Sequence, residues 1–592
     1  MSTATLKVEA QLVSGTWTDL KADILASPGL KLSYGIQGNG PLDVVAATGE
    51  LSFVLRNDAG NSVATQGAYS PIHASVRTGW TFGIPIRVVL THGAATVFSV
   101  SSLTRSGATA TAQTSASHGL STGAWVTIAG AAQTEYNGTF QVTVIDADEF
   151  SYTVSGTPAS PATGTITATQ GYIKFRGKVR VIAPEPGRYL TQRVQVTAYD
   201  VMRDLMEGQV RELDLEINQP EDVLLDAILD ALPSAAQPPA RDLDAGIDTY
   251  PYAFDNVGAG VQAAGLIKDV VQSGLGLFYA KGDGTVVYDT RHARATGTSA
   301  FTFTNTMRRG GLVVPSSLDK VFNHVRTTTH PKTVDAAATT VLWSATGTPP
   351  SLAAGATLTI WGDYRDPDDT RRLVGGTAVV DGVLATDGTD YAANTAADGT
   401  GSNVAASVAV TATAFASTVK FVIVNNHSAT VYLVTGAGAT HLRIRGKGVY
   451  DDGPQTFDAA STQTYGERPV NVDLPYQDDP EIGQSAADYL EEQYNDLASQ
   501  VEEIEFLAND SDDLMTQALA REPGDLITVT ETLTGLSSVK AVIQRVELDI
   551  TLGSSGPRIL GRFGLAPGAP YAVFLWGVVG NAEWGETTVW GF

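Results

Sequence analysis

The sequence predicts a mainly β, multidomain protein, in which β-barrel or sandwich domains accompany one small α+β domain. Short runs rich in Val, Thr, Phe and Tyr recur about every 8 to 15 residues and are separated by Gly, Pro, Asn or Asp, as in packed antiparallel sheets. The length of 592 residues corresponds to roughly three to six domains. The 60 Gly and 26 Pro residues supply the many turns that such sheets need.

Composition excludes several classes of function. The formal net charge of -25 argues against a protein dedicated to binding nucleic acids, because an acidic surface repels the phosphate backbone. The absence of cysteine excludes disulfides, thiolate metal sites and a cysteine nucleophile. The opening segment lacks the features of a secretion signal, and no uncharged stretch approaches 18 apolar residues. We therefore expect a chain that is made in a cytoplasm and has no membrane-spanning segment.

The first predicted domain is a β-barrel that a second domain interrupts. It comprises residues 1–102 plus 169–205, and four of its strands are expected at Thr5 to Leu12, Leu30 to Tyr34, Glu50 to Arg56 and Ile84 to Leu90. Between these two pieces the composition shifts to Ala, Thr, Ser and Gly. Residues 103–168 are therefore predicted to be an inserted small β domain, with core candidates at Trp125, Val126, Ile128, Tyr136, Phe140, Val142, Val144, Phe150, Tyr152 and Val154.

Residues 206–315 are predicted to form the α+β domain. The segment PEDVLLDAILDALP places Val223, Leu224, Ala227, Ile228, Ala231 and Leu232 on one helical face. A second helix is expected at Gly260 to Ser273. A hairpin with a GDG turn should then join Leu277 to Ala280 with Val286 to Tyr288.

Three further units complete the predicted organisation. Residues 316–475 form a β-rich domain with long loops, since segments such as TGTPPSLAAG are rich in turn residues. Residues 476–565 form a second β-barrel domain, which begins with an amphipathic helix carrying Ala486, Ala487, Leu490, Tyr494 and Leu497 and continues with strands at Val501 to Leu507, Leu526 to Glu531, Val539 to Ile550 and Ile559 to Gly564. Residues 566–592 form a Trp-rich tail.

No catalytic, cofactor or metal site is predicted. The pattern Gly119-Leu120-Ser121-Thr122-Gly123 has the spacing of a nucleophile elbow but leads into a β module, which favours a turn. The eight histidines lack metal-site spacing. The acidic segments Asp363 to Asp369 and Asn509 to Asp513 lack the calcium-loop pattern and are interpreted as solvated turns. No glycine-rich phosphate cradle has its full pattern.

Two sets of residues are candidate partner contacts. Lys174, Arg176, Lys178 and Arg180 alternate along one strand, which indicates either a solvated outer face or an electrostatic contact with an acidic neighbouring subunit. Trp576, Trp584, Trp590 and Phe592 lie on a tail too short to bury them by itself. That tail either folds back onto its own barrel or docks onto another chain.

Several segments follow one another along the chain in the same order as similar segments of one known family. The chain opens with KVEAQLVSGTWTDLKADILASPGLKLSYGI and GELSFVLRN, and continues with FRGKVRVIAPEPG, VQVTAYDVMRDL, SGLGLFYAKGDGTVVYDTRHAR, LDKVFNHV, LRIRGKGVY, TQTYGERP and REPGDLITVTE. In this order they resemble the hub proteins at the tail tip of long-tailed bacteriophages, the family related to the central hub of contractile-tail baseplates. The resemblance covers roughly residues 1 to 98 and 170 to 565, and the inserted domain departs from the simplest hub.

The resemblance implies a hub-like ring protomer. Three chains would form a homotrimer in which two barrel domains per chain match a hexameric tail tube, and DNA would pass through the ring without specific binding. The implied partners are the tail tube or distal tail protein ring, the tape measure protein and distal tip or fibre proteins. The implied location is the virion tail tip, after assembly in the cytoplasm of the host bacterium. No peptidase or muramidase segment follows Pro567, so no enzymatic activity and no cofactor are expected.

Two other classes stay open. A virion carbohydrate-binding adhesin would use long loops and Trp rings to contact cell-surface sugars, and an aromatic-lined groove on an exposed loop would favour it. A polysaccharide depolymerase would need two carboxyl groups about 5 to 9.5 Å apart in a cleft.

Overall fold

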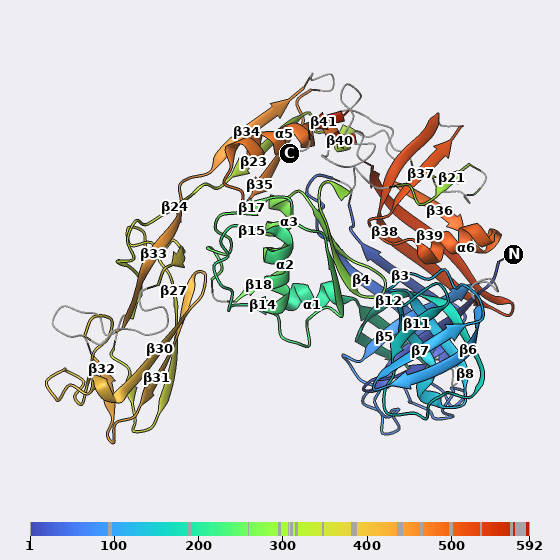
Figure 1. Ribbon diagram of the computed structural model, residues 1–592, viewed down its shortest axis with the longest axis horizontal. Coiled ribbons are helices and arrows are strands. Elements are labelled where there is room, and N and C mark those ends of the chain that lie inside the picture. The colour runs from blue at the N-terminus through green and yellow to red at the C-terminus, as the bar shows by residue number, and fades with distance from the viewer. Residues whose placement is uncertain are drawn as a thin grey trace.

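The computed structural model describes residues 2–38, 40–92, 97–187, 192–258, 260–293, 298–305, 307, 312–313, 318–345, 348–379, 388–434, 442–461, 466–495, 501–532, 535–568, 572–574 and 588–590. Sheets dominate the fold, which confirms the predicted mainly β, multidomain class. In Figure 1 the green helices and short strands lie at the centre, residues 332–451 extend as an arm at the left, and the blue and red strands lie side by side at the right.

We call the first set of strands the N-terminal sheet. Its neighbours follow the order β2-β1-β5-β12-β13-β4-β3, and every pair is antiparallel. All four strands predicted in this part of the sequence are present; alternating residues bury one face of β3 and β4, whereas β5 is buried on both faces from Ile86 to Leu90. The bounds are β1 Ala4–Val13, β2 Thr16–Asp19, β3 Leu30–Gly35, β4 Ala47–Arg56, β5 Pro85–His92, β12 Gly164–Glu185 and β13 Arg193–Tyr199.

The second set, which we call the C-terminal sheet, contains the four strands predicted after residue 500. Its order is β21-β37-β38-β39-β36-β22, with bounds β21 Thr302–Thr304, β22 Leu312–Val313, β36 Glu503–Leu507, β37 Leu526–Glu531, β38 Leu536–Gly553 and β39 Gly556–Pro567. Strands β21 and β22 come from the segment that the sequence assigned to the α+β domain. Helix α6 (Asp512–Ala520) packs its apolar residues into the same core.

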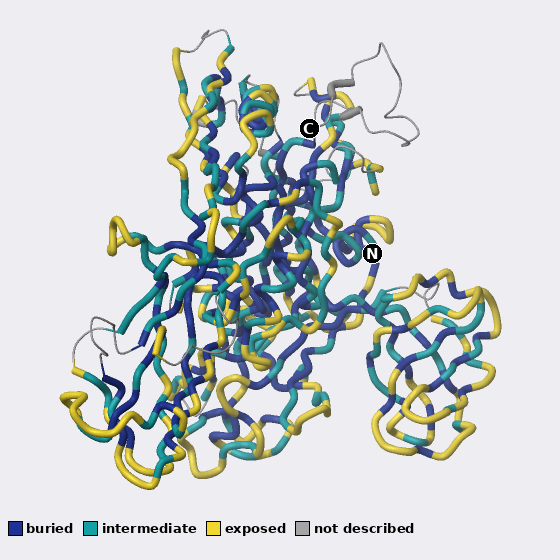
Figure 2. The backbone as a smooth tube through the Cα atoms, turned by 60° about the vertical axis from the view of Figure 1, so that its left-hand side comes forward, coloured by how far each residue is buried: buried dark blue, intermediate teal, exposed yellow. Residues whose placement is uncertain are grey.

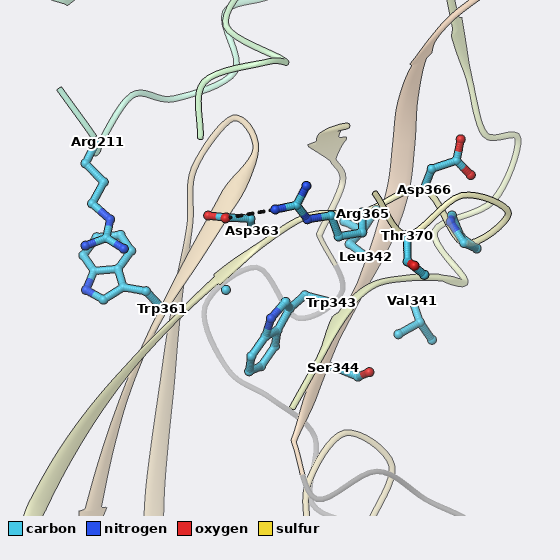
Figure 3. Close-up of a pocket in the computed structure, with 12 residues that line it drawn as sticks. Arg211, Val341, Leu342, Trp343, Ser344, Trp361, Asp363, Arg365, Asp366 and Thr370 are labelled. Atoms are coloured by element: carbon cyan, nitrogen blue, oxygen red, sulfur yellow. Dashed lines mark hydrogen bonds and ion pairs between the residues drawn. The ribbon is translucent and has the colours of Figure 1, made fainter. Parts of the chain in front are cut away.

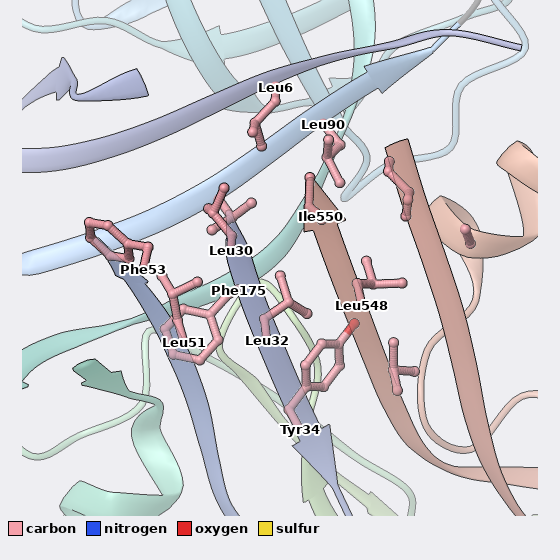
Figure 4. Packing of buried hydrophobic residues seen from close by; sticks show 14 of the residues in the cluster. Leu6, Leu30, Leu32, Tyr34, Leu51, Phe53, Leu90, Phe175, Leu548 and Ile550 are labelled. Atoms are coloured by element: carbon pink, nitrogen blue, oxygen red, sulfur yellow. The ribbon is translucent and has the colours of Figure 1, made fainter. Parts of the chain in front are cut away.

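The two sheets join through β3 and β38. These strands pair antiparallel from Leu30 opposite Ile550 to Gly35 opposite Arg545, although they are more than 500 residues apart. Figure 4 shows Leu30, Leu32 and Tyr34 beside Leu548 and Ile550. Side chains from both sheets belong to one hydrophobic cluster. The two barrel-like segments expected from the sequence are therefore fused within one chain, because β3 pairs with the part of β38 that extends beyond its pairing with β37.

The interrupting segment has a hydrophobic cluster of its own, drawn from residues 98–168. Its strands are β6 Val97–Ser106, β7 Thr109–Thr114, β8 Trp125–Ala131, β9 Gly138–Gln141, β10 Thr143–Val144 and β11 Glu149–Thr153, together with the start of β12. In Figure 2 this segment is the lobe at the lower right, which narrow connections attach to the rest. The candidate Trp125 lies outside the cluster, because its indole reaches across to Asp283.

The α+β segment packs three helices against short strands and has its own core. Both predicted helices and the hairpin are present. The predicted face of the first helix is wrong at Val223, which is exposed, because the buried face instead runs through Glu221, Leu224, Leu225, Ile228 and Leu229. The bounds are α1 Val201–Glu207, α2 Glu221–Asp230, α3 Ala263–Ser273, β14 Gln209–Val210, β15 Gln219–Pro220, β16 Ala240–Leu243, β17 Thr249–Tyr250, β18 Val261–Gln262, β19 Leu277–Ala280 and β20 Thr285–Asp289.

The arm is built from small antiparallel sheets around another core. Its strands are β24 Lys332–Val334, β25 Thr340–Ser344, β26 Ser351–Leu352, β27 Thr357–Asp363, β28 Gly375–Thr377, β29 Ala393–Asn394, β30 Val408–Ala414, β31 Thr418–Asn425, β32 Val431–Leu433 and β33 Arg443–Asp451. At its base, β23 (His324–Thr329) lies between β34 (Gln455–Ala460) and β35 (Pro469–Leu474). Helix α5 (Pro480–Tyr494) covers this sheet with the predicted residues Ala486, Leu490 and Tyr494.

Two ion pairs and a hydrogen bond fix the arm to the centre. The ammonium of Lys332 contacts the carboxylate of Asp255, that of Lys420 lies 2.8 Å from Glu212, and Ser417 donates to the carbonyl of Val257. Among the described helices, none is long and apolar enough to cross a membrane.

Candidate functional site

The four basic residues predicted as partner contacts lie on β12, but the side chains of that strand do not alternate strictly between its two faces. The pairing register shifts between Ile173 and Phe175 and again between Val179 and Val181, so Lys174 and Arg180 sit at β-bulges. Each bulge changes which side chains face the core. The prediction of one solvated face is therefore wrong: Lys174, Arg176, and the neighbours Lys178 and Arg180 lie in three different environments.

Lys174 is fully buried and bound within its own chain. Its ammonium lies 2.6 Å from the carboxylate of Glu522 and donates to the carbonyl of Arg521 at 2.8 Å. Glu522 also accepts from the backbone N–H of Gly282. Burial raises the pKa of Glu522, while the charge of Lys174 opposes that rise. This pair connects the N-terminal sheet, the hairpin β19–β20 and the turn before β37.

Lys178 and Arg180 face helix α1. The carboxylate of Asp204 accepts from Lys178 at 2.7 Å and from Arg180 at 2.5 Å, and Glu207 lies 3.3 Å from Arg180. The acidic neighbour that the sequence suggested for these side chains is thus a helix of the same chain.

Arg176 differs from the other three. Within the described residues it forms no ion pair, and it lines a cleft of about 610 Å³ between the N-terminal sheet and the inserted lobe. Trp17, Arg87 and Trp125 line the same cleft. Arg87 is compensated by Glu9 at 2.7 Å and lies over the Trp17 ring at 4.2 Å. Of the basic set, Arg176 alone forms no hydrogen bond or ion pair among the described residues; burial lowers its pKa, and the charge of Asp283 opposes that shift.

Most of the Trp-rich tail lies outside the described residues, including Trp576, Trp584 and Phe592. Two short strands are described, β40 (Ala572–Phe574) and β41 (Thr588–Trp590). They pair in parallel, with Phe574 opposite Trp590. The two outcomes predicted for the tail therefore stay predictions.

The residues considered for catalysis and metal binding form ordinary turns and a helix start. Ser121 accepts a turn hydrogen bond from Ala124, as expected for the turn interpretation. Asp366 and Asp369 bond to Asp368 and Arg371 of their own turn. Within the described part of the chain, no three His, Asp or Glu side chains cluster closely enough to hold a metal ion.

The second acidic segment begins a helix that the sequence analysis missed. Ser511 accepts from the N–H of Leu514 at 3.1 Å and caps α6, while Asp512 and Asp513 occupy its first turn. Asn509 is buried and joins Ser2, Pro557 and Ile559 through hydrogen bonds. The segment is therefore structural.

A groove of about 450 Å³ lies where the arm meets the centre, and we call it the arm groove (Figure 3). Strand β25 contributes Trp343 and Ser344, β27 contributes Trp361 and Asp363, the following turn contributes Arg365, Asp366 and Thr370, and the segment after β14 contributes Arg211. Its volume falls within the range of about 300 to 1,000 Å³ typical of small-molecule sites.

Packing fixes both indole rings of the arm groove. Trp361 stacks on Phe415 with ring centroids 5.8 Å apart, and the guanidinium of Arg211 lies 4.1 Å from its centroid. Trp343 packs on Phe421 at 5.6 Å. A side chain at Gly362 would meet the Trp343 ring at 2.4 Å, so only glycine lets the ring lie there. The groove walls are thus set before any ligand arrives.

No single sequence signal pointed to the arm groove. Trp343 and Trp361 are 18 residues apart on strands that do not pair directly, and Arg211 comes from another segment altogether. Two signals could have drawn attention to it, namely the Trp-Gly pair within a β-strand and the acidic turn DYRDPDD that follows. That turn was instead interpreted as solvated, and the aromatic surface was expected on the tail.

No protein-family model matches the chain, and no curated protein is similar to it in sequence. One similar solved structure is the 43 kDa tail protein of prophage MuSo2 from Shewanella oneidensis, with a TM-score of 0.39, 8% identity and coverage of 95% of this chain and 96% of that chain. Another is a tail protein from Neisseria meningitidis MC58, with a TM-score of 0.42, 9% identity and coverage of 95% and 96%.

Proposed function

We propose that the chain is the protomer of a trimeric hub at the tail tip of a long-tailed bacteriophage. In this role it joins the hexameric tail tube to the distal tip and surrounds the channel through which DNA leaves. The proposal rests on the ordered resemblance of its segments to tail-tip hub proteins. Its strongest structural support is the pairing of β3 with β38, which fuses two barrel-like sheets side by side in one protomer.

That pairing gives one chain two similar wall segments at a fixed spacing. Three such chains supply six segments, the number needed to match a hexameric tube. A closed ring also covers sheet edges that would otherwise offer unpaired backbone groups to other chains. A ring of three chains would therefore present six similar wall segments and so a pseudo-sixfold surface.

Charge suits a channel that passes DNA without holding it. Three chains carry a formal charge of -75, three times the -25 of one chain. Acidic walls facing the channel repel the phosphate backbone, so DNA slides past without specific contacts. Above the ring we place the tail tube or distal tail protein ring and the tape measure protein. Below it we place the distal tip or fibre proteins, with Trp576, Trp584, Trp590 and Phe592 as candidate anchors.

The inserted lobe belongs on the outside of this ring. It has its own hydrophobic cluster, and it enters and leaves the N-terminal sheet through neighbouring strands β5 and β12. The proposed role is structural rather than enzymatic, and the virion tail tip is its location.

Native mass spectrometry of the purified protein tests the assembly. We expect a species of three chains that persists at micromolar concentration. A monomer as the sole species, or a ring of six chains, would contradict the proposal. Incubation of the trimer with peptidoglycan and capsular polysaccharide should release neither peptides nor reducing ends, and release abolished by a single Asp or Glu substitution would contradict the structural role.

A carbohydrate-binding adhesin is the second candidate function. The observation that favours it is the arm groove, because aromatic walls beside polar side chains are the feature expected of such a protein. A hub protomer has room for this site on its arm, so the two functions are compatible.

A further inference from the structure

The arm groove has more hydrogen-bonding groups than its own chain uses. Within the described residues, neither indole N–H of Trp343 and Trp361 has a partner, and neither do the hydroxyls of Ser344 and Thr370. Asp363 accepts from Arg365 at 3.3 Å, which leaves further acceptor positions on the carboxylate. A ligand that fills the groove therefore needs donors and acceptors at several positions and an apolar surface for the rings.

Charges in the arm groove are compensated with one exception. Arg365 pairs with Asp363, and Asp366 lies 3.7 Å from Arg372. Arg211 forms no hydrogen bond or ion pair within the described part of the chain, and its Nε–H is buried without an acceptor. Figure 3 shows its guanidinium beside Trp361, at the side of the groove opposite Asp366. An anionic group on a ligand would pair with the terminal N–H groups of this guanidinium, which are not buried, through charge-assisted hydrogen bonds.

We propose that the arm groove binds a saccharide that carries a carboxylate group. A sugar ring has an apolar C–H face for the Trp343 indole and hydroxyls for Ser344, Thr370 and Asp363, while the Trp361 ring, covered by Phe415 and Arg211, holds the guanidinium in place. Its carboxylate pairs with Arg211, since a guanidinium presents a fork that fits a carboxylate. An acidic peptide fits less well, because Asp363 and Asp366 repel additional negative charges while they accept hydrogen bonds from hydroxyl groups.

This site is independent of the trimeric hub, since the residues described for it all belong to one chain. Loss of ligand binding with an intact trimer would therefore overturn this inference alone.

Isothermal titration of the full-length protein tests the proposal. The probes are trigalacturonate, a hyaluronan tetrasaccharide and sialyllactose, with maltotriose and lactose as neutral counterparts. We expect at least one acidic probe to bind more tightly than both neutral sugars. Arg211→Gln should weaken that binding about tenfold or more, and added salt should weaken binding to the native protein. Arg211→Lys, which keeps the charge but loses the fork, should give an intermediate affinity.

Arg371→Gln is the matched control. Arg371 is an exposed arginine of the same turn, pairs with Asp369 and does not line the groove. It should leave the affinity within about twofold, and unchanged circular dichroism should accompany every variant. Gly362→Ala, which displaces the Trp343 ring, should weaken binding without touching any charge.

Three results would overturn the inference. One is that none of the three acidic saccharides binds. Another is that neutral and acidic saccharides bind equally and Arg211→Gln changes neither. The last is that a tetraglutamate peptide binds through Arg211 while every saccharide fails, which would assign the groove to an acidic peptide instead.

Discussion

Two β-bulges decide where the basic side chains of β12 point. The sequence pattern Lys-x-Arg-x-Lys-x-Arg predicts one face, whereas the register shifts beside Lys174 and Arg180 divide the set: Lys174 pairs with Glu522, Lys178 and Arg180 share Asp204, and Arg176 lines a cleft. A bulge leaves no reliable mark in a single sequence, because it depends on which residue of the neighbouring strand lies opposite. The partners that Lys174, Lys178 and Arg180 have within the chain could therefore not be predicted from the sequence.

The ion pair between Lys174 and Glu522 joins segments that are far apart in the sequence, so we expect its loss to destabilise the protein strongly. Lys174→Met should lower the free energy of unfolding by about 3 kcal/mol, because it leaves a carboxylate in a site built for an ion pair. Lys174→Met combined with Glu522→Gln should recover at least half of that loss. Urea unfolding followed by circular dichroism measures both values.

Lys178→Met is the control for these two variants. Arg180 still compensates Asp204 in it, and the ion pair between Lys178 and Asp204 is partly exposed. It should cost less than about 1 kcal/mol. Equal losses for Lys174→Met and Lys178→Met would show that burial does not distinguish the two pairs.

We expect Asp200 to make the stability of the folded protein depend on pH. It is buried, its Oδ1 caps α1 by accepting from Met202 at 3.1 Å, and its Oδ2 has no partner among the described residues. Burial raises its pKa from 3.8 to about 7. The folded state therefore holds the proton more tightly than the unfolded chain. The contribution of Asp200 to stability is present below about pH 4 and is lost as the pH rises toward 7.

Asp200→Asn should remove this dependence, because asparagine caps a helix equally well and stays neutral. At pH 8 the variant should be more stable than the native protein by a few kcal/mol, since one pKa unit corresponds to about 1.4 kcal/mol. At pH 4 the two should unfold at the same urea concentration. A variant that is no more stable at pH 8 would contradict the assignment.

Helices show which parts of an element a sequence can predict. For α2 the helix itself was predicted, but its buried face was not: Val223 was assigned to that face, whereas the core covers the side that carries Glu221 and Leu225. Helix α6 was missed, because NDSDD was examined as an ion site. Ser511 followed by two aspartates is also the pattern of a capped helix start.

Strand pairing between β3 and β38 allows a test by disulfide. Ser33 and Glu547 are direct partners on one partly exposed face, at a Cα separation that a disulfide can span. The native chain has no cysteine, so Ser33→Cys combined with Glu547→Cys introduces a single pair. Oxidation should give a cross-link within one chain, seen as a mobility shift without dimers on a nonreducing gel.

The control for the disulfide is Ser33→Cys combined with Asp549→Cys, because Asp549 lies opposite Lys31 rather than Ser33. It should cross-link more slowly. A cross-link between chains in the first variant would mean that β38 pairs with a neighbouring copy.

At the scale of the whole molecule, the sequence indicated the β class, the interruption of the first sheet and two barrel-like segments. It did not indicate that these segments share a sheet, since pairing across more than 500 residues leaves no local signal. The arm groove was missed for the same reason, because Arg211, Trp343 and Trp361 meet only after the arm docks on the centre.

The central claim is that each chain supplies two wall segments to a threefold ring. A symmetry-free electron cryomicroscopy reconstruction of the purified assembly measures this directly. We expect three chains around one axis, with the N-terminal and C-terminal sheets alternating to give six wall segments and the inserted lobe outside. A ring in which only one of the two sheets from each chain lines the axis, or an assembly without a threefold axis, would contradict the account.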